Sequence, residues 1–522
     1  MPETVLQENR IKGDVDVTEE TVVKQSCTHN IFHGPPPKYL KRWMVAVGAV
    51  LLHMSIGSVY AWSCVKSALD EKYEDEDIGM QITFSIAIFF LGMSAAFAGT
   101  IIDRVGPVLT SLVSSILYPL GMILLGFFAQ IEKGSTFRWL AYVSYGVVGG
   151  IGLGFGYVSP VSTLVKWFPD RRGFATGIAV CGFGGGSLIM TYLVMALQEI
   201  KVDGEELDIG VILIIMGCLY LVFMLVATFF FIRLPAPGYA PEGYIPKSIV
   251  NRTPECQKKI VDWWTEKVQK KEKRNWDLIK VVEELTGKQA IKTWQFFNIW
   301  LVLFLNIHTG ISFLAFYHEM VKNIFGEYDP IEEEHILNDE FNSTLLALTA
   351  VANMGGRFFW AFLSDYIGRK TVFCIFGFLA CAIMGVLPTF VTNYEDSQKT
   401  GDMVGFIVLF FILYTVYGGG YAVLPATLAD VFGTKNVASV HGFILTAWAT
   451  AGLVGPIWAS AVVGDDNDYQ TPMYIMCGLS FIEFILALLM KELPAKEYID
   501  PNADLEKGQA KEEKKWWKFG KK

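Results

Sequence analysis

The stretch Leu345–Lys370, LLALTAVANMGGRFFWAFLSDYIGRK, reads as one membrane-crossing helix with a single arginine inside it. Arg357 lies eight residues before Asp365, which begins the polar turn at the end of the stretch. At 1.5 Å per residue, Arg357 is about 12 Å into a hydrocarbon layer about 30 Å thick. An arginine without a partner costs about 2.5–3.5 kcal/mol at that depth, so we expect it to have a function. Gly355 and Gly356 beside it leave room for another group to come close.

The composition of the 522-residue chain is that of a membrane protein with many spans. Apolar residues make up 52% of it and charged residues only 18%, and long apolar runs alternate with short polar turns. The 8 cysteines form no CxxC pair, so neither a disulfide framework nor a metal site is predicted. No paired carboxylates, catalytic triad or metal cluster falls at one depth of the spans, so an enzyme is not expected. We also expect no cofactor and no nucleic-acid partner.

Twelve apolar stretches are long enough to cross a membrane as helices. They form two groups of six, so the sequence predicts an all-α membrane protein with twelve transmembrane helices in two six-helix repeats. The predicted spans are Trp43–Val65, Met80–Ile102, Leu109–Gln130, Leu140–Leu164, Phe174–Leu197, Ile209–Arg233, Phe297–Met320, Leu345–Ser364, Thr371–Val391, Met403–Leu424, Ala438–Val463 and Met473–Met490.

Five parts follow from this division. They are a polar amino-terminal segment (1–40), a first helical bundle (41–234), a linker (235–292), a second bundle (293–491) and a tail (492–522). The first part has no apolar core of signal-peptide type, so we expect the first span itself to direct insertion. The linker stretch Pro254–Glu284 has two interpretations: an amphipathic helix on the inner leaflet, or a solvated linker helix.

The loops between the spans alternate in charge. Acidic loops are Asp70–Asp77, Gly204–Asp208, Gly326–Glu340 and Gly464–Tyr469. The other loops are basic and contain Lys38, Lys41, Arg42, Arg104, Lys166, Arg171, Arg172, Arg369 and Lys370. By the positive-inside rule the basic loops are cytoplasmic, so both termini are predicted to lie in the cytoplasm. We expect a monomer in the lipid bilayer of the plasma membrane.

Two sequence echoes relate the halves. The turn after the second span, Gly99–Gly106 (GTIIDRVG), and the turn after the eighth, Ala361–Arg369 (AFLSDYIGR), both place Gly three residues after Asp. Tyr157 and Tyr421 each precede a phenylalanine by eleven residues. The offsets between the halves, 262 and 264 residues, nearly agree, as expected for two parallel repeats related by an axis along the membrane normal.

These features resemble the major facilitator superfamily, whose signature is the GxxxDRxG turn after the second span. The chain is more closely similar to the oxalate/formate antiporter family, which is related to the monocarboxylate transporters. The resemblance covers the twelve predicted spans. It rests on Tyr60-Ala-Trp62, Lys166–Gly177 (KWFPDRRGFATG), Gly356–Arg369 (GRFFWAFLSDYIGR) and Gly419–Pro425 (GGYAVLP).

The resemblance implies a carrier of small carboxylates whose halves rock around a central site. In such a carrier Arg357 would bind the carboxylate, and a structural arginine paired within the protein is the alternative. Aromatic residues would line the cavity: Tyr60, Tyr157, Tyr417 and Tyr421. One departure concerns the eleventh span, where the oxalate carrier has a lysine and this chain has Trp448. The second charge of a dicarboxylate would then be buried unpaired, so a monocarboxylate such as lactate, pyruvate, acetate or formate fits better.

Other polar residues are candidates for coupling and gating. His53 and His308 are candidate proton carriers, because histidine titrates near neutral pH; the alternative is a neutral histidine bonded between helices. Glu483 is an acidic residue deep in the twelfth span, and the sequence does not tell whether it faces Arg357. Four charged residues flank the predicted inner ends of helices and are expected to form ion pairs that stabilise a gate: Asp103, Arg104, Asp365 and Arg369.

The sequence therefore predicts a secondary active transporter of a small carboxylate, by alternating access, with proton symport and anion exchange both open. Its expected partners are the carboxylate, lipid and, for symport, protons. Two alternatives remain: an oxalate/formate-type dicarboxylate exchanger, and a sensor on a transporter scaffold that does not transport.

Overall fold

A computed structural model of the chain shows how the predicted spans are arranged. It describes residues 36, 40–73, 80–131, 134–202, 205–235, 285–329, 334–336, 339–397, 399–464 and 467–490. Most of the predicted amino-terminal segment, the linker stretch Pro254–Glu284 and the tail lie outside the described residues.

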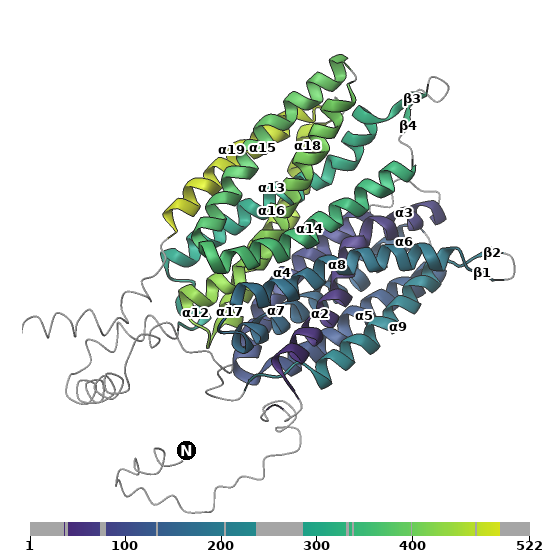
Figure 1. Ribbon diagram of the computed structural model, residues 1–522. Coiled ribbons are helices and arrows are strands. Elements are labelled where there is room, and N and C mark those ends of the chain that lie inside the picture. The colour runs from purple at the N-terminus through teal and green to yellow at the C-terminus, as the bar shows by residue number, and fades with distance from the viewer. Residues whose placement is uncertain are drawn as a thin grey trace, which may run out of the picture.

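The first half contains six helical spans, drawn from purple to teal in Figure 1. The first span is interrupted by a 3-10 segment, and the fourth contains a π-helix; such segments are often found at functional sites. In order, the elements are α2 (Arg42–Gly57), η2 (3-10, Ser58–Ala61), α3 (Trp62–Tyr73), α4 (Met80–Val105), α5 (Pro107–Ile131), α6 (Gly134–Ala141), η3 (π, Tyr142–Gly149), α7 (Gly150–Trp167), α8 (Arg172–Gln198) and α9 (Ile209–Phe230).

The second half repeats this pattern, from teal to yellow in Figure 1. A short helix, α12 (Gly287–Ala290), precedes it. The spans that follow are α13 (Trp294–Phe325), α14 (Asp339–Ile367), α15 (Arg369–Ser397), α16 (Thr400–Phe432), α17 (Val437–Ile444) continued by α18 (Thr446–Val463), and α19 (Gln470–Leu489).

The all-helical membrane fold is confirmed. Eleven stretches of the described residues are long and apolar enough to cross a membrane. The remaining predicted span is α14, a helix of 29 residues that packs along α16 and α8. Large apolar side chains such as Phe97, Trp139 and Ile457 are exposed on the outside of the bundle, as in a protein whose solvent is lipid.

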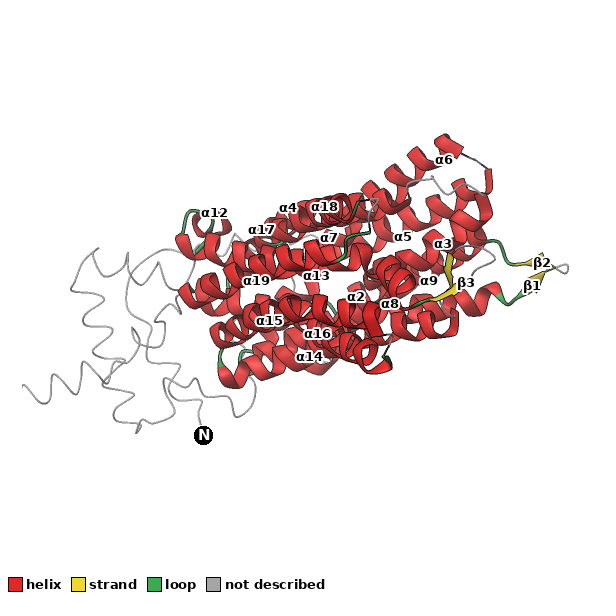
Figure 2. Ribbon diagram, turned by 90° about the horizontal axis from the view of Figure 1, so that it is seen from above, coloured by secondary structure: helices red, strands yellow, loops and turns green. Residues whose placement is uncertain are grey.

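The molecule has two distinct ends, and the helices run between them (Figure 2). One end carries two small hairpins, β1 (Lys201–Val202) with β2 (Glu205–Glu206), and β3 (Glu327–Asp329) with β4 (Glu334–Ile336). We call it the hairpin end. The opposite end carries α12 and the start of α17, and we call it the gate end (Figure 1).

Two local features differ from the sequence prediction. The hairpins lie in acidic loops for which no strands were predicted. In addition, α16 does not stop at Leu424 but continues through Pro425 to Phe432. A proline inside a membrane helix is tolerated because neighbouring helices and side chains satisfy the freed backbone groups.

The echo between the halves is also present in the backbone. Gly106 ends α4 with φ of 90°, and Gly368 follows α14 with φ of 92°. Only glycine adopts this left-handed conformation without strain, so the chain leaves both helices through the same kind of turn. The turns that the sequence aligned therefore share their geometry.

Candidate functional site

Arg357 lies at the contact between the two halves and is only 1% exposed. Its Nε donates to Oδ1 of Asn353, one turn earlier on α14, at 2.8 Å. Its Nη1 donates to the carbonyl oxygen of Val180 on α8, in the other half, at 3.1 Å. Its Nη2 is buried and has no hydrogen-bond partner. Two nitrogens therefore position the guanidinium, and the third is left for another acceptor.

Aromatic rings surround the guanidinium and come from both halves. The Cζ atom of Arg357 lies 5.3 Å from the ring centroids of Phe183 and Tyr421 and 5.6 Å from that of Tyr60. These distances are within the range of cation–π attraction, which grows when the pair is shielded from water. The rings compensate part of the charge without neutralising it.

The predicted aromatic residues form one cluster with Arg357. Trp448 packs on Tyr421 with ring centroids 4.6 Å apart and on Tyr157 at 5.3 Å. Tyr421 donates from its hydroxyl to that of Tyr417 at 3.1 Å. The structure thus places Tyr60, Tyr157, Tyr417, Tyr421 and Trp448 in one cluster, in which Tyr60 and Tyr421 face the arginine; their role in binding a substrate stays a prediction.

Several polar atoms of this cluster are buried and unpaired. They are the hydroxyls of Tyr60 and Tyr157 and the indole N–H of Trp448, together with Nη2 of Arg357. Buried donors are almost always satisfied in a folded protein, so a group of orphaned donors around one cation requires an explanation. An anion with two oxygen atoms would satisfy such a group.

His53 packs against the aromatic cluster and links three helices of the first half. Its ring stacks on Tyr157 at 5.1 Å, and its nitrogens lie 2.8 Å from the carbonyl oxygen of Ala179 and 3.0 Å from that of Tyr157. A carbonyl can only accept, so both bonds form at once only when the imidazole is protonated. The geometry fits the predicted proton-carrying role and equally a histidine that links α2, α7 and α8.

His308 is placed away from the arginine. It lies on α13, where its Nε2 accepts a hydrogen bond of 2.6 Å from the indole of Trp458 on α18. An indole N–H only donates, so Nε2 carries a lone pair in this arrangement. The contacts are those of a neutral histidine bonded between helices, which was the alternative interpretation.

Sequence reasoning missed three residues of the site. Phe183 carries part of the ring cluster, and Asn353 orients the guanidinium. His441 on α17 is 1% exposed, lies 5.9 Å from the ring of Tyr157, and has no hydrogen-bond partner on either nitrogen. The spacing could have found two of them: Asn353 is one turn before Arg357, and His441 is two turns before Trp448 on the same face.

At the gate end, two aspartates join the halves in the same way. Asp365, near the end of α14, accepts from the backbone N–H of Gly173 at 3.0 Å and of Phe174 at 2.8 Å, in the first turn of α8. Asp103, near the end of α4, accepts from the backbone N–H of Ser439 at 2.8 Å, in the first turn of α17. The first-turn N–H groups of a helix lack partners and attract negative charge, so each carboxylate caps a helix of the opposite half.

Ion pairs add to the closure of the gate end. Asp430 of α16 binds Arg172 of the other half at 2.7 Å and Arg369 at 3.2 Å, and Arg369 also binds Asp365 at 2.5 Å. Two of the four predicted gate residues, Asp365 and Arg369, are therefore in this ion-pair network, and a third, Asp103, caps α17 by hydrogen bonding. The fourth, Arg104, is exposed at the end of α4.

An apolar hollow of about 400 Å³ opens beside the site, between α2, α8 and α14. Its lining includes Val50, Met54, Leu188, Met354 and Phe358. A hollow without polar side chains can hold an alkyl chain but cannot orient a carboxylate. We therefore place the candidate anion site at Nη2 of Arg357 and not in this hollow.

The molecule has two halves of similar helices, a buried cation where they meet, and a closed gate at one end. This architecture is that of a membrane carrier that works by alternating access. The chain belongs to the Major Facilitator Superfamily, whose sequence model matches residues 51–328 and again residues 299–518. It is thus a multi-pass integral membrane protein.

Three known proteins similar to this chain are carriers of small organic acids by name. The "Oxalate:formate antiporter" of Oxalobacter formigenes is 26% identical over 448 residues, 85% of this chain and 90% of that protein. The "Apicoplast pyruvate carrier 1" of Toxoplasma gondii is 24% identical over 463 residues, 77% of this chain and 81% of that protein. The "Monocarboxylate transporter 14" of Mus musculus is 23% identical over 501 residues, 88% of this chain and 91% of that protein.

The solved structure of a proton:xylose symporter bound to 6-bromo-6-deoxy-D-glucose has a similar fold. Its TM-score is 0.58 at 13% sequence identity, with 86% of this chain and 94% of that chain covered. At this identity the likeness supports the fold alone.

Proposed function

We propose that the protein is a secondary transporter that moves a small monocarboxylate across a membrane by alternating access. The observation that carries this proposal is the free Nη2 of Arg357, buried where the two halves meet. A fixed cation with no bonded carboxylate among the described residues is suited to an anion. The orphaned donors of Tyr60, Tyr157 and Trp448 suit the second oxygen or a hydroxyl of the same molecule.

The charge count favours one carboxylate over two. Arg357 supplies one permanent positive charge, and the resemblance to the oxalate/formate antiporter family puts Trp448 where the oxalate carrier has a lysine. The names of the similar proteins cover oxalate, formate, pyruvate and monocarboxylates, which supports the small-carboxylate class without choosing a member.

Substrate binding and movement of the halves would be linked through Arg357. A carboxylate is a stronger acceptor than a backbone carbonyl, so a bound anion competes with the Val180 oxygen for the guanidinium. Breaking that bond removes one link between α14 and α8. Other links between the halves lie toward the gate end, at Asp365, Asp103 and Asp430, and these would break as the carrier opens there.

Dicarboxylate exchange is a second candidate, and His441 is the observation in its favour. Its unpaired imidazole lies 5.9 Å from Tyr157, on the gate side of the aromatic cluster. A protonated His441 would supply the second positive charge that a dianion needs. Replacement of His441 by glutamine should then abolish exchange of oxalate while exchange of lactate continues.

The test is counterflow in proteoliposomes loaded with unlabelled acid, with labelled lactate, formate or oxalate outside. We expect labelled monocarboxylate to enter faster than in protein-free liposomes, and oxalate to compete poorly. Equal exchange of oxalate would favour the second candidate. Absence of counterflow for every carboxylate would reject transport and favour a sensor.

We further propose that the carrier is a monomer in the plasma membrane with its gate end facing the cytoplasm. The basic residues of the loops gather at that end, including Arg172 and Arg369 of the ion-pair network. Both termini would then be cytoplasmic.

A further inference from the structure

A second polar cluster lies in the second half, apart from Arg357. Glu483 of α19 is 0% exposed, and its Oε1 accepts a hydrogen bond of 3.1 Å from Nδ2 of Asn306 on α13. Its Oε2 has no hydrogen-bond partner, and neither has Oδ1 of Asn306. One turn toward the hairpin end, the hydroxyls of Thr309 and Ser480 are 3.2 Å apart. The seam between α13 and α19 thus contains a closed polar patch built around one carboxyl group.

No basic side chain of the described residues bonds to this carboxyl group. The lysines and arginines of the two helices that pack most extensively against α19 lie in terminal turns, at Lys322 of α13 and at Arg369 and Lys370 of α15. Helix α18 contains no titratable residue. Since an ionised carboxylate without a cation is costly at this depth, the site favours a neutral, protonated acid.

The other titratable groups around the seam are not permanent charges. His308 of α13 points to Trp458, and Cys381 of α15 lies 3.7 Å from Cys477 of α19. Tyr417 and Tyr421 of α16 bond to each other. Glu483 is therefore an acidic group that has no ion-pair partner among the described residues of the seam, so a proton is what can neutralise it.

One turn of α16 separates the two polar sites. A Cβ atom at Gly418 would lie 3.2 Å from Cγ of Arg357, and a Cβ atom at Gly420 would overlap Oδ1 of Asn306. The backbone of α16 is thus in direct contact with the substrate arginine on one side and with the partner of Glu483 on the other. If α16 moves relative to Arg357, its contact with Asn306 must change as well, and the reverse also holds.

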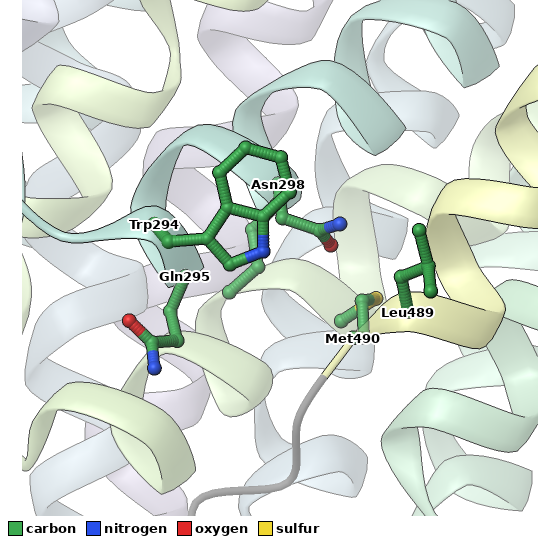
Figure 3. Close-up of a pocket in the computed structure, with 6 residues that line it drawn as sticks. Trp294, Gln295, Asn298, Leu489 and Met490 are labelled. Carbon is green, nitrogen blue, oxygen red and sulfur yellow. The ribbon is translucent and has the colours of Figure 1, made fainter.

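The seam ends in a small pocket at the gate end, and Figure 3 shows residues that line it. There, Asn298 of α13 and Leu489 of α19 line a pocket of about 10 Å³, close to the volume that one water molecule needs. Nδ2 of Asn298 donates to the carbonyl oxygen of Leu486, and its Oδ1 is unpaired. Two turns deeper on the same face lies Asn306, and the fully buried Val302 stands between them. In this conformation Val302 separates Glu483 from this pocket.

We propose that Glu483 is the proton-binding site of the carrier and that a carboxylate on Arg357 moves together with a proton on Glu483. The carboxylate of Glu483 takes a proton from water on one side of the membrane and becomes a neutral acid; it returns the proton to water on the other side. This inference rests on the proposed function, because it names the coupling ion of the same transport cycle. One anion and one proton move together, so net transport carries no charge.

The test compares the wild type with Glu483→Gln in proteoliposomes, using labelled lactate or formate, whichever shows counterflow. With the outside one pH unit more acidic, we expect the wild type to accumulate substrate about tenfold, unaffected by a potassium-diffusion potential. In Glu483→Gln we expect accumulation to vanish while counterflow stays within about threefold of the wild type, because exchange does not require release of the proton. Glu483→Asp should restore part of the accumulation, and Glu395→Gln, at an exposed position near the end of α15, is the matched control and should accumulate substrate like the wild type.

Infrared spectroscopy tests proton binding without any transport. The carbonyl band of a protonated carboxyl group should be present in the wild type and missing in Glu483→Gln. Equal pH-driven accumulation by the wild type and Glu483→Gln would overturn the inference, as would net uptake by the wild type that ignores the pH gradient; in both cases the proposed function stands. If no carboxylate is exchanged at all, both proposals fail together.

Discussion

At the gate end the two halves use the same device, whereas at the centre they differ. Asp103 caps α17 of the opposite half and Asp365 caps α8, and each aspartate precedes a glycine in a left-handed turn. At the centre, by contrast, the cation lies in one half only. The internal offset of 262 residues pairs Arg357 with Ala95, and Glu483 with Leu221.

This difference suggests a division between closing the gate, which both halves do, and binding the anion, for which one half supplies the charge. Closing a gate is a task that both halves share, since each half must dock a helix terminus of the other. Binding one anion needs a single cation, and a second one would repel the first in a low dielectric. Both halves supply rings, but in the proposed mechanism the first half adds only the Val180 carbonyl, whereas the second half adds Arg357 and Glu483.

The largest expected effect is at the centre, in Arg357→Lys. Lysine keeps the charge but cannot bond Asn353 and Val180 while leaving one nitrogen for the substrate. Hydrogen bonds to charged groups contribute about 1.5–3 kcal/mol, so counterflow should fall about 10- to 100-fold. Arg104→Lys, an exposed arginine at the gate end, is the matched control and should transport normally. Full activity of Arg357→Lys would remove the arginine from the mechanism.

The next test adds a second cation to the centre with Trp448→Lys. The indole of Trp448 is fully buried against Tyr157 and Tyr421, and its N–H is unpaired. A lysine there would pair the second charge of a dicarboxylate, and we expect oxalate counterflow to rise by about tenfold. Trp458→Lys, ten residues along the same helix and outside the aromatic cluster, should leave oxalate excluded. If neither variant binds oxalate, charge count does not set the selectivity.

The sequence predicted the fold well because membrane spans and turns are local signals. The length of the apolar runs, and the glycine after each aspartate, depend on neighbouring residues only. The resemblance to a known family named Arg357 and the aromatic residues that the structure brings into one cluster, and their role in binding stays a prediction. The sequence did not predict the environment of Glu483, because the contact with Asn306 joins residues 177 positions apart. Nor could the length of α16 be predicted at Pro425, where packing by other helices overrides the local effect of proline.

A third comparison concerns the two gate aspartates. Asp365→Asn should weaken the gate more than Asp103→Asn, because Asp365 caps α8 and also forms an ion pair with Arg369, whereas Asp103 caps α17 and forms no ion pair among the described residues. A loss of about 1–2 kcal/mol at a partly buried helix terminus corresponds to about a 5- to 30-fold change in the open fraction.

Thiol labelling can measure this opening. A cysteine introduced at the buried Ala426, one turn from the inter-half contact at Ala422, should react faster with a maleimide in both variants when the native cysteines are replaced. Asp396→Asn, exposed at the hairpin end of α15, should not change the labelling rate. Faster labelling in only one of the two gate variants would show that the two capping aspartates are not equivalent in function.

The smallest effect, and the sharpest test of symmetry, is expected at the two turn glycines. Gly106→Ala and Gly368→Ala each force a Cβ atom into a backbone with φ near 90°, which should destabilise the fold by about 1–2 kcal/mol. Gly478→Ala is the control: its Cβ would meet no atom within 4 Å, and alanine favours the helix by up to about 1 kcal/mol. Unfolding in detergent should give equal losses for the two turn variants and none for the control. Unequal losses would mean that the two turns share a backbone conformation but contribute differently to the stability of the fold. The symmetry of the gate end would then be one of geometry alone.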